Sequence, residues 1–149
     1  MISILFFLIL SVVTPASAIF EHDHAVLKGQ QNAWEKSQEY MQKALIHNPT
    51  DPVVLYDAGV SAYKAGDYQA AQTYFSKTVD TTTDPQLKEQ ALFNTANAQV
   101  HLKKLPEALA SLQKILAQNP THKNAAHNKK VIQAKVEQEG GSNNDQWNY

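Results

Sequence analysis

The sequence predicts an all-α fold, a short right-handed solenoid of antiparallel helix pairs with about seven helices and a C-terminal capping helix. Three observations lead to this prediction. The tripeptide Asn-Pro-Thr occurs twice, first at residue 48. An Asp-Pro pair occurs at residues 51–52 and 84–85, where the carboxylate can cap a helix that begins at the proline. Between these landmarks, the segment from Leu55 aligns with the segment from Leu92, so the chain repeats.

The expected elements follow from these landmarks in chain order. Four extra residues before Ala96 in the third unit add one helical turn, which keeps its buried face in phase. The repeat domain is expected over residues 19–139, and residues 140–149 are expected to form a disordered tail because they have no periodic apolar face. The domain divides into a degenerate repeat, two regular repeats and a capping helix: 19–51, 52–84, 85–122 and 121–138. The expected helices span residues 20–30, 33–47, 52–65, 68–80, 85–102, 105–118 and 121–138.

The first 18 residues have the features of a secretory signal peptide. An apolar run extends from Ile4 to Val13, and after Pro15 the residues Ala16-Ser17-Ala18 have the small-x-small pattern of a signal-peptidase site. About a dozen apolar residues are too few for a finished transmembrane helix. We therefore expect cleavage after Ala18 and a periplasmic or exported protein. An uncleaved tether to the inner membrane is the alternative, because no lysine or arginine precedes the apolar run.

Small residues occupy positions where helices are expected to approach closely. Gly59 and Gly66 lie in an alanine-rich segment, although each glycine costs a helix about 1 kcal/mol relative to alanine. Gly59 and its counterpart Ala96 would admit a neighbouring helix, and Phe75 and Leu112 would fill the space beside them. Gly66 would form the tight turn between two helices. Both glycines are therefore interpreted as architectural.

The repeat resembles the tetratricopeptide repeat, a helix–turn–helix unit of about 34 residues. The second unit matches the pattern W-x2-L-G-x2-Y…A-x3-F at Leu55, Ala58, Gly59, Ala71 and Phe75. The third unit matches it at Leu92, Ala96, Ala108, Leu112 and Pro120. The degenerate first unit keeps the period with Ala25, Ser37, Met41 and Pro49. Three residues depart from the pattern, namely Thr78, Ile115 and the displaced tyrosine Tyr63.

Composition excludes several classes of function. The chain has 13 basic and 14 acidic side chains and a formal net charge of −1, which argues against nucleic acid or an anionic membrane surface as the main partner. The absence of cysteine removes disulfides, thiolate metal sites and a cysteine nucleophile. The sequence has no phosphate-binding glycine loop, nucleophile elbow or paired-histidine zinc motif. We therefore expect no enzymatic activity and no cofactor.

An alternative function is metal or ligand binding near the N-terminus. His22 and His24 lie beside Glu21 and Asp23, but a spacing of two residues does not place both imidazoles on one helix face. Solvated histidines are the simpler interpretation, and no metal site is assigned. A third possibility is self-association through the exposed ends of a short solenoid.

The candidate binding residues lie on the first helices of the second and third units and on the capping helix. In the resemblance, side chains of these helices line a concave groove that binds peptides. Aromatic rings provide apolar anchors, and asparagine amides can hydrogen-bond a peptide backbone. Tyr56 and Phe93 are the main candidate anchors, with packing between repeats as their alternative role. The candidate residues are Tyr56, Asp57, Val60, Tyr63, Phe93, Asn94, Asn97, His101, His127 and Asn128, with Val53, Lys64, Val100 and Val131 beside them.

A clamp for a C-terminal carboxylate is not expected in this groove. Family members that form such a clamp combine groove asparagines with lysines and an arginine. Asn97 and Asn128 occupy suitable positions here, but the basic partners are missing.

The whole pattern resembles the small tetratricopeptide proteins of the bacterial aerotolerance (Bat) group. The segments "LYDAGVSAYKAGDYQAAQTYF", "KEQALFNTANAQVHLKKLPEAL" and "NPTHKNAAHNKKVIQ" carry this resemblance. Such proteins occur beside von Willebrand A-type proteins and a MoxR-type ATPase, and they are thought to assist envelope complexes. The resemblance implies a noncatalytic exported scaffold that binds a protein or peptide segment and assists the assembly of envelope complexes, with von Willebrand A-type proteins as candidate partners.

Overall fold

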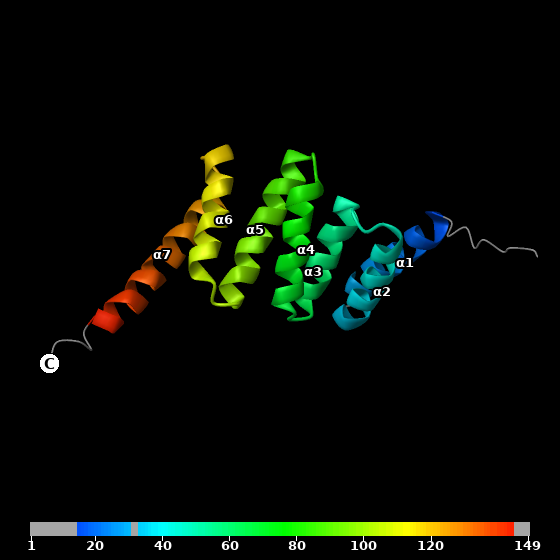
Figure 1. The fold of residues 1–149 in the computed structure, drawn as a ribbon, viewed down its shortest axis with the longest axis horizontal. Helices are drawn as coiled ribbons and strands as arrows, with labels where there is room; N and C mark the ends of the chain where they lie inside the picture. Colours follow the sequence, from blue (N-terminus) through cyan, green and yellow to red (C-terminus); the bar gives the residue numbers. More distant parts are fainter. Residues whose placement is uncertain (1–14, 31–32, 145–149) are drawn as a thin grey trace, which may run out of the picture.

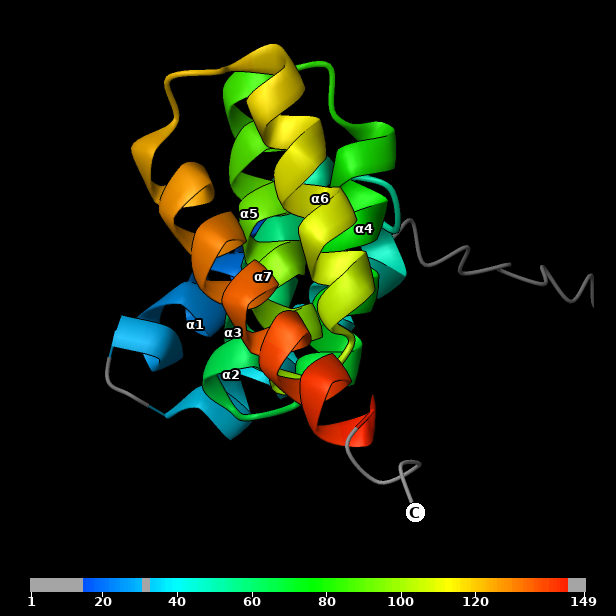
Figure 2. The same cartoon turned by 90° about the vertical axis from the view of Figure 1, so that its left-hand side faces the viewer.

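The computed structural model describes residues 15–30 and 33–144, which form seven helices and no strand. The helices follow one another in a row along the long axis of the molecule, and each packs against the next (Figure 1). Viewed from the end, α1 and α7 lie on one side and α4 and α6 on the other (Figure 2). The predicted all-α solenoid is confirmed. The helices are α1 Pro15–Gln30, α2 Trp34–His47, α3 Pro52–Lys64, α4 Tyr68–Thr81, α5 Pro85–His101, α6 Leu105–Gln118 and α7 Lys123–Asn144.

The five middle helices agree with their expected bounds to within one residue, and the two end helices are longer. α1 begins at Pro15 instead of residue 20, because the fixed φ and missing N–H of proline suit a first helical turn. α7 continues through Gly140 and Gly141 into the segment expected to be disordered, since each added residue of an existing helix gains a backbone hydrogen bond. The apolar run at residues 4–13 and Trp147 lie outside the described residues.

Aspartate side chains cap the helices that begin the regular repeats. Asp51 accepts hydrogen bonds from the backbone N–H groups of Val53 and Val54, at 2.8 and 3.2 Å. Asp84 accepts one from Gln86 at 2.8 Å, and each aspartate precedes a proline at the first helical position. These contacts confirm the role expected of the two Asp-Pro pairs. The extra turn of the third unit is confirmed as well, because α5 has 17 residues and α3 has 13.

The turns between paired helices share one backbone geometry. Gly66 has a φ of +85°, and Lys103, 37 residues later, has a φ of +59°. The residue after each donates its N–H to a carbonyl five residues back, from Asp67 to Ala62 at 2.9 Å and from Lys104 to Gln99 at 2.8 Å. This is the Schellman arrangement, in which a left-handed residue ends a helix. Glycine adopts that conformation freely, whereas lysine is strained in it.

Replacing Lys103 with glycine is expected to raise the free energy of unfolding by about 1 kcal/mol, because the left-handed conformation costs a residue with a Cβ about 1–2 kcal/mol. Part of that gain is offset by the greater freedom of glycine in the unfolded chain. Gly66→Ala is the matched opposite change, and it isolates backbone strain because no atom lies within 4 Å of the added Cβ. Chemical denaturation measures both effects. A destabilised Lys103→Gly variant would contradict the shared turn geometry.

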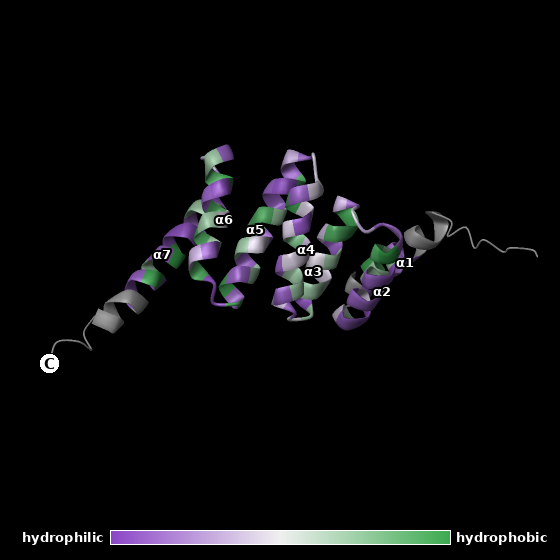
Figure 3. Cartoon of the chain, in the orientation of Figure 1, coloured by the Kyte–Doolittle hydropathy of each residue, from purple (hydrophilic) through white to green (hydrophobic). Residues whose placement is uncertain are grey.

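The core is built from positions that repeat along the chain. Hydrophobic stretches recur along the helices with polar ones between them (Figure 3). Met41, Phe75 and Leu112 occupy equivalent places on the second helix of each pair, and each is at most 1% exposed. A Cβ added to Gly59 would lie 2.6 Å from two ring carbons of Phe75, which confirms that the glycine permits a close approach.

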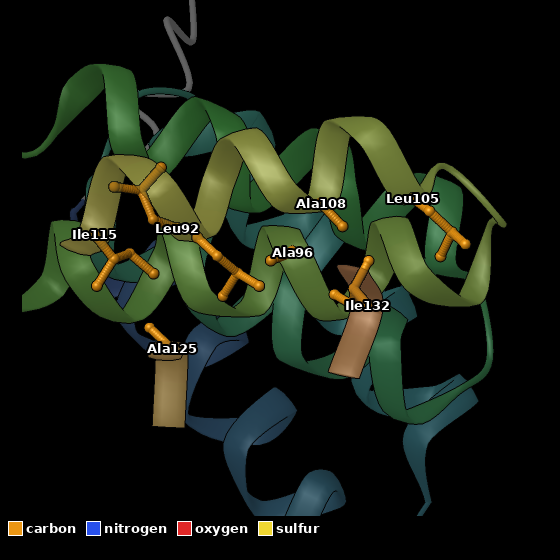
Figure 4. Packing of buried hydrophobic residues seen from close by; sticks show 8 residues of the cluster. Leu92, Ala96, Leu105, Ala108, Ile115, Ala125 and Ile132 are labelled. Carbon is orange, nitrogen blue, oxygen red and sulfur yellow. The ribbon is translucent and has the colours of Figure 1, made fainter. Parts of the chain in front are cut away.

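The last core cluster joins three helices. In Figure 4, side chains of α5 and α6 face one another, and Ala125 and Ile132 approach them from α7. Two departures from the repeat pattern, Thr78 on α4 and Ile115 on α6, are buried. Thr78 is fully buried and its hydroxyl donates to the carbonyl of Tyr74 at 3.0 Å, and Ile115 is buried beside Leu112. The cap therefore completes the buried face of the third repeat.

Candidate functional site

Four of the candidate groove residues line one open pocket of about 210 Å³, here called the C-terminal pocket. It lies between α3, α5 and α7, so two first helices and the capping helix contribute to it. Val100 and Val131, which the sequence places beside the candidates, line it too, and Ile132 is the remaining apolar wall. Its lining residues are Tyr63, Asn97, Val100, His101, Asn128, Val131 and Ile132.

Aromatic rings form one side of the C-terminal pocket. The imidazole of His101 stacks on the ring of Tyr68, with 4.0 Å between centroids and 6° between planes. Tyr63 meets both rings edge-on, at 5.2 Å from Tyr68 and 5.4 Å from His101. Burial raises the pKa of the Tyr63 phenol, with a smaller contribution from Tyr68, so Tyr63 remains a neutral hydrogen-bond donor.

Two amides provide the polar chemistry of the C-terminal pocket. Asn128 on α7 donates from Nδ2 to Oδ1 of Asn97 on α5, across 3.5 Å. This long bond leaves the amide donors of Asn97 and the amide oxygen of Asn128 for a ligand. A donor and an acceptor side by side match the C=O and N–H of a peptide backbone. No lysine, arginine or carboxylate is among the described residues that line this pocket.

A second open pocket of about 220 Å³, here called the N-terminal pocket, lies between α1, α2 and α3. Two of the candidate residues, Asp57 and Val60, line it from α3. Asp57 Oδ2 lies 2.8 Å from Nε2 of His22, which ties α1 to α3. The remaining lining residues are Ala25, Val26, Trp34, Ser37, Met41 and Ser61.

Tyr56 takes part in packing between repeats. Its ring lies 5.6 Å from that of Phe75, and Asn94 donates from Nδ2 to its hydroxyl at 2.9 Å. Burial raises the pKa of the Tyr56 phenol, although the bond from Asn94 opposes this rise. The phenol therefore keeps its own proton, which it can donate to another acceptor.

Phe93 takes part in packing as well. It packs against the last core cluster, and its ring stacks on His122 with 5.7 Å between centroids. His122 Nδ1 accepts the backbone N–H of Ala125 at 3.1 Å, and Nε2 lies 3.6 Å from Oε1 of Glu89. The packing role that the sequence left open for Phe93 is thus present, at the junction of the third repeat and the cap. His127, the last candidate residue, is exposed on α7.

Sequence reasoning missed part of the site in the degenerate first repeat. Trp34, Met41 and Val26 line the N-terminal pocket but were not among the candidates. The repeat period could have identified Val26 as a candidate, because it lies 34 residues before Val60. The role of His122 at the start of α7 was also missed, because histidine is not a usual helix cap.

The histidines of the alternative metal site have other contacts. His22 pairs with Asp57, and the ring of His24 lies 5.5 Å from that of Tyr40. Within residues 15–30 and 33–144, no three His, Cys, Asp or Glu side chains are grouped so that they could hold a metal ion. In the same part of the chain, no helix combines the length and hydropathy needed to cross a bilayer.

A family model described as tetratricopeptide repeat matches residues 22–86 and again residues 56–123. The chain belongs to the tetratricopeptide repeat family. The matched ranges include α2 to α6, which contain the recurring small and large core residues. Among curated proteins, no sequence relative of this tetratricopeptide repeat protein is found.

Several solved structures have the same fold. The second TPR domain of human RPAP3, in complex with the HSP70 peptide SGPTIEEVD, has a TM-score of 0.69 and 18% identity over 79% of this chain and 96% of that one. The Yersinia enterocolitica chaperone SycD, in complex with a peptide of the translocator YopD, has a TM-score of 0.66 and 15% identity over 87% and 98%. MamA RS-1 has a TM-score of 0.72 and 21% identity over 82% and 67%.

Proposed function

We propose that this protein binds an extended segment of a partner protein in its concave groove and acts as a noncatalytic scaffold. The observation that carries the proposal is the C-terminal pocket, where two first helices and the capping helix bring aromatic rings and two amides together around an uncharged space. The peptides bound by RPAP3 and SycD support it, because both proteins share this fold. Apolar contacts would provide affinity, and the amides would fix the register of the backbone.

Replacing Asn97 and Asn128 together with alanine is expected to weaken binding of a peptide by about 2 kcal/mol, or about thirtyfold. The probes are peptides selected from a random library on the unmodified chain, and titration calorimetry measures their affinity. The melting temperature is expected to change little, because removing both partners leaves neither amide unpaired.

The matched control for this pair is Lys43→Ala with Gln113→Ala, two exposed residues on α2 and α6. This control is expected to retain full affinity for the selected peptides. Equal affinity of the asparagine variant and the control would place binding outside the C-terminal pocket. Failure to select any peptide would contradict the proposed function.

We further propose that the protein is exported and assists the assembly of cell-envelope protein complexes, with von Willebrand A-type proteins as candidate partners. The signal-like first 18 residues and the resemblance to the Bat group support this proposal. N-terminal sequencing of the protein from its native host is expected to find Ile19 as the first residue, since Ala16-Ser17-Ala18 fits a signal-peptidase site. An intact Met1 in the membrane fraction would instead favour the uncleaved tether.

A further inference from the structure

We infer that the protein has a second binding site, outside the groove, which takes a phenolic ring: the side chain of a tyrosine or a small free phenol. The site is a pocket of about 240 Å³ bordered by α4, α5 and α6, here called the polar pocket. α4 and α6 lie on the side of the molecule opposite α1 and α7 (Figure 2). The polar pocket shares no lining residue with the N-terminal or the C-terminal pocket, so it goes beyond the proposed groove function.

The repeat pattern explains why this space is open. Tyr40 on α2 and Tyr74 on α4 lie 34 residues apart at equivalent positions, and the third repeat has Ser111 at that position, 37 residues after Tyr74. Tyr74 packs with Leu45 against one of the core clusters. The equivalent of Leu45 is Val79, which lines the polar pocket together with Ser111. The pocket therefore lies where the third repeat lacks the phenol that the second repeat supplies itself.

Three buried polar side chains line the polar pocket. Thr95, Gln99 and Ser111 are 5%, 7% and 7% exposed. The equivalents of Thr95 and Gln99 in the second repeat are Ala58 and Ala62, which are buried in its core clusters. The third repeat thus replaces two alanines and a tyrosine with hydrogen-bonding groups around an open space.

The hydrogen bonds within the polar pocket leave one donor and two acceptors. Ser111 Oγ donates to Oε1 of Gln99 at 2.9 Å, and Thr95 Oγ1 donates to the carbonyl of Ala91 at 2.8 Å. Within residues 15–30 and 33–144, no group accepts a hydrogen bond from Nε2 of Gln99. Both hydroxyl oxygens keep lone pairs. A phenol hydroxyl can accept from Gln99 and donate to either hydroxyl oxygen, so it satisfies the buried amide.

The size and charge of the polar pocket also suit a neutral ring. A protein cavity of about 150 Å³ binds benzene, so this larger pocket can hold one substituted ring. Leu92 and Val79 provide apolar walls for it. Asp80 and Lys114 line the pocket as exposed side chains of opposite charge, so the pocket favours neither an anion nor a cation.

The test uses p-cresol, which is the tyrosine side chain as a free molecule, and toluene, which lacks only its hydroxyl. NMR titration of the full chain, labelled with ¹⁵N and at valine and threonine methyl groups, measures both affinities. p-Cresol is expected to bind at least about tenfold more tightly, because toluene leaves the Gln99 amide unpaired. We expect the largest shift changes at Thr95, Val79 and the Gln99 amide, and small ones at Val100 and Val131, which line the C-terminal pocket.

Two substitutions test the assignment of the site. Ser111→Tyr restores the residue of the first two repeats, so it is expected to fill the pocket and abolish p-cresol binding with the fold intact, as circular dichroism can verify. Gln99→Met keeps the length of the side chain but removes its amide, so the preference for p-cresol over toluene is expected to fall below about twofold. Gln113→Met, exposed on α6 and outside the pocket, is the matched control and should retain the full preference.

Equal affinity for p-cresol and toluene, no binding of p-cresol, or undiminished binding to the Ser111→Tyr variant would overturn the inference. So would shift changes centred on Val100 and Val131, because they would place the ring in the groove. If Ser111→Tyr does not fold, Gln99→Met decides: a lost preference supports the site, and a retained preference overturns it.

A third probe, N-acetyltyrosine amide, distinguishes the two sources of the phenol. Binding as tight as that of p-cresol would indicate a tyrosine of a partner chain, and binding of p-cresol alone would indicate a small free phenol. The library-selected peptides test the groove function independently, so failure of the polar pocket leaves that function unaffected.

Discussion

Replacing Phe75 with alanine is expected to lower the free energy of unfolding by about 3–5 kcal/mol. The ring is 1% exposed, contacts the ring of Tyr56 and packs in the cluster that joins α3, α4 and α5. The stability of a solenoid is approximately the sum of the stabilities of its repeats and of the interfaces between neighbours, so a cavity in the second repeat also weakens its packing against the third. Urea denaturation followed by circular dichroism measures the loss.

Ile46→Ala is the control for the Phe75 variant, because it removes an apolar side chain that is 76% exposed. Its free energy of unfolding should change by less than about 0.5 kcal/mol. A Phe75→Ala variant that loses less than 1 kcal/mol would show that Phe75 is not the centre of the second repeat.

Gly59→Leu is expected to destabilise the protein by about 3 kcal/mol or more, and by more than Gly59→Ala. A Cβ alone would come within 2.6 Å of the Phe75 ring, which is buried and cannot move aside easily. Alanine is normally better than glycine in a helix by about 1 kcal/mol, so a loss on Gly59→Ala would itself reveal the steric conflict. Thermal and urea unfolding of both variants provide the comparison.

A second substitution distinguishes steric conflict from other effects at Gly59. In a Phe75→Leu background the ring carbons that meet the added Cβ are gone, so Gly59→Ala should cost less there than in the original protein. Equal tolerance of leucine and alanine at Gly59 would contradict the close approach of α3 and α4.

The period of the repeat made the main elements predictable from the sequence. Gly59, Phe75 and Leu112 lie at matching positions, and the one-turn insertion in α5 preserves their phase. The pattern also predicted that Tyr63, Asn97, His101 and Asn128 share a surface, because residues of successive first helices recur with the same period. The structure brings these four side chains to the C-terminal pocket.

Features that depend on contacts between distant side chains could not be predicted in this way. The N-terminal pocket depends on Trp34 and Met41 of the degenerate repeat, where the pattern was weakest. The stacking of Phe93 on His122 and the hydrogen bond from Asn94 to Tyr56 require knowledge of how two helices face each other. Periodicity identifies which residues share a face, but it does not show which side chains meet across it.

Binding in the groove is tested most directly by NMR of valine methyl groups in the intact chain. A library-selected peptide is added to protein labelled at valine. We expect the largest chemical-shift changes at Val60, Val100 and Val131, which line the two pockets, and small changes at Val79 and Val136, which pack against the core. Large changes at Val79 with unchanged Val100 and Val131 would show that the peptide binds elsewhere and would contradict the groove as the binding site.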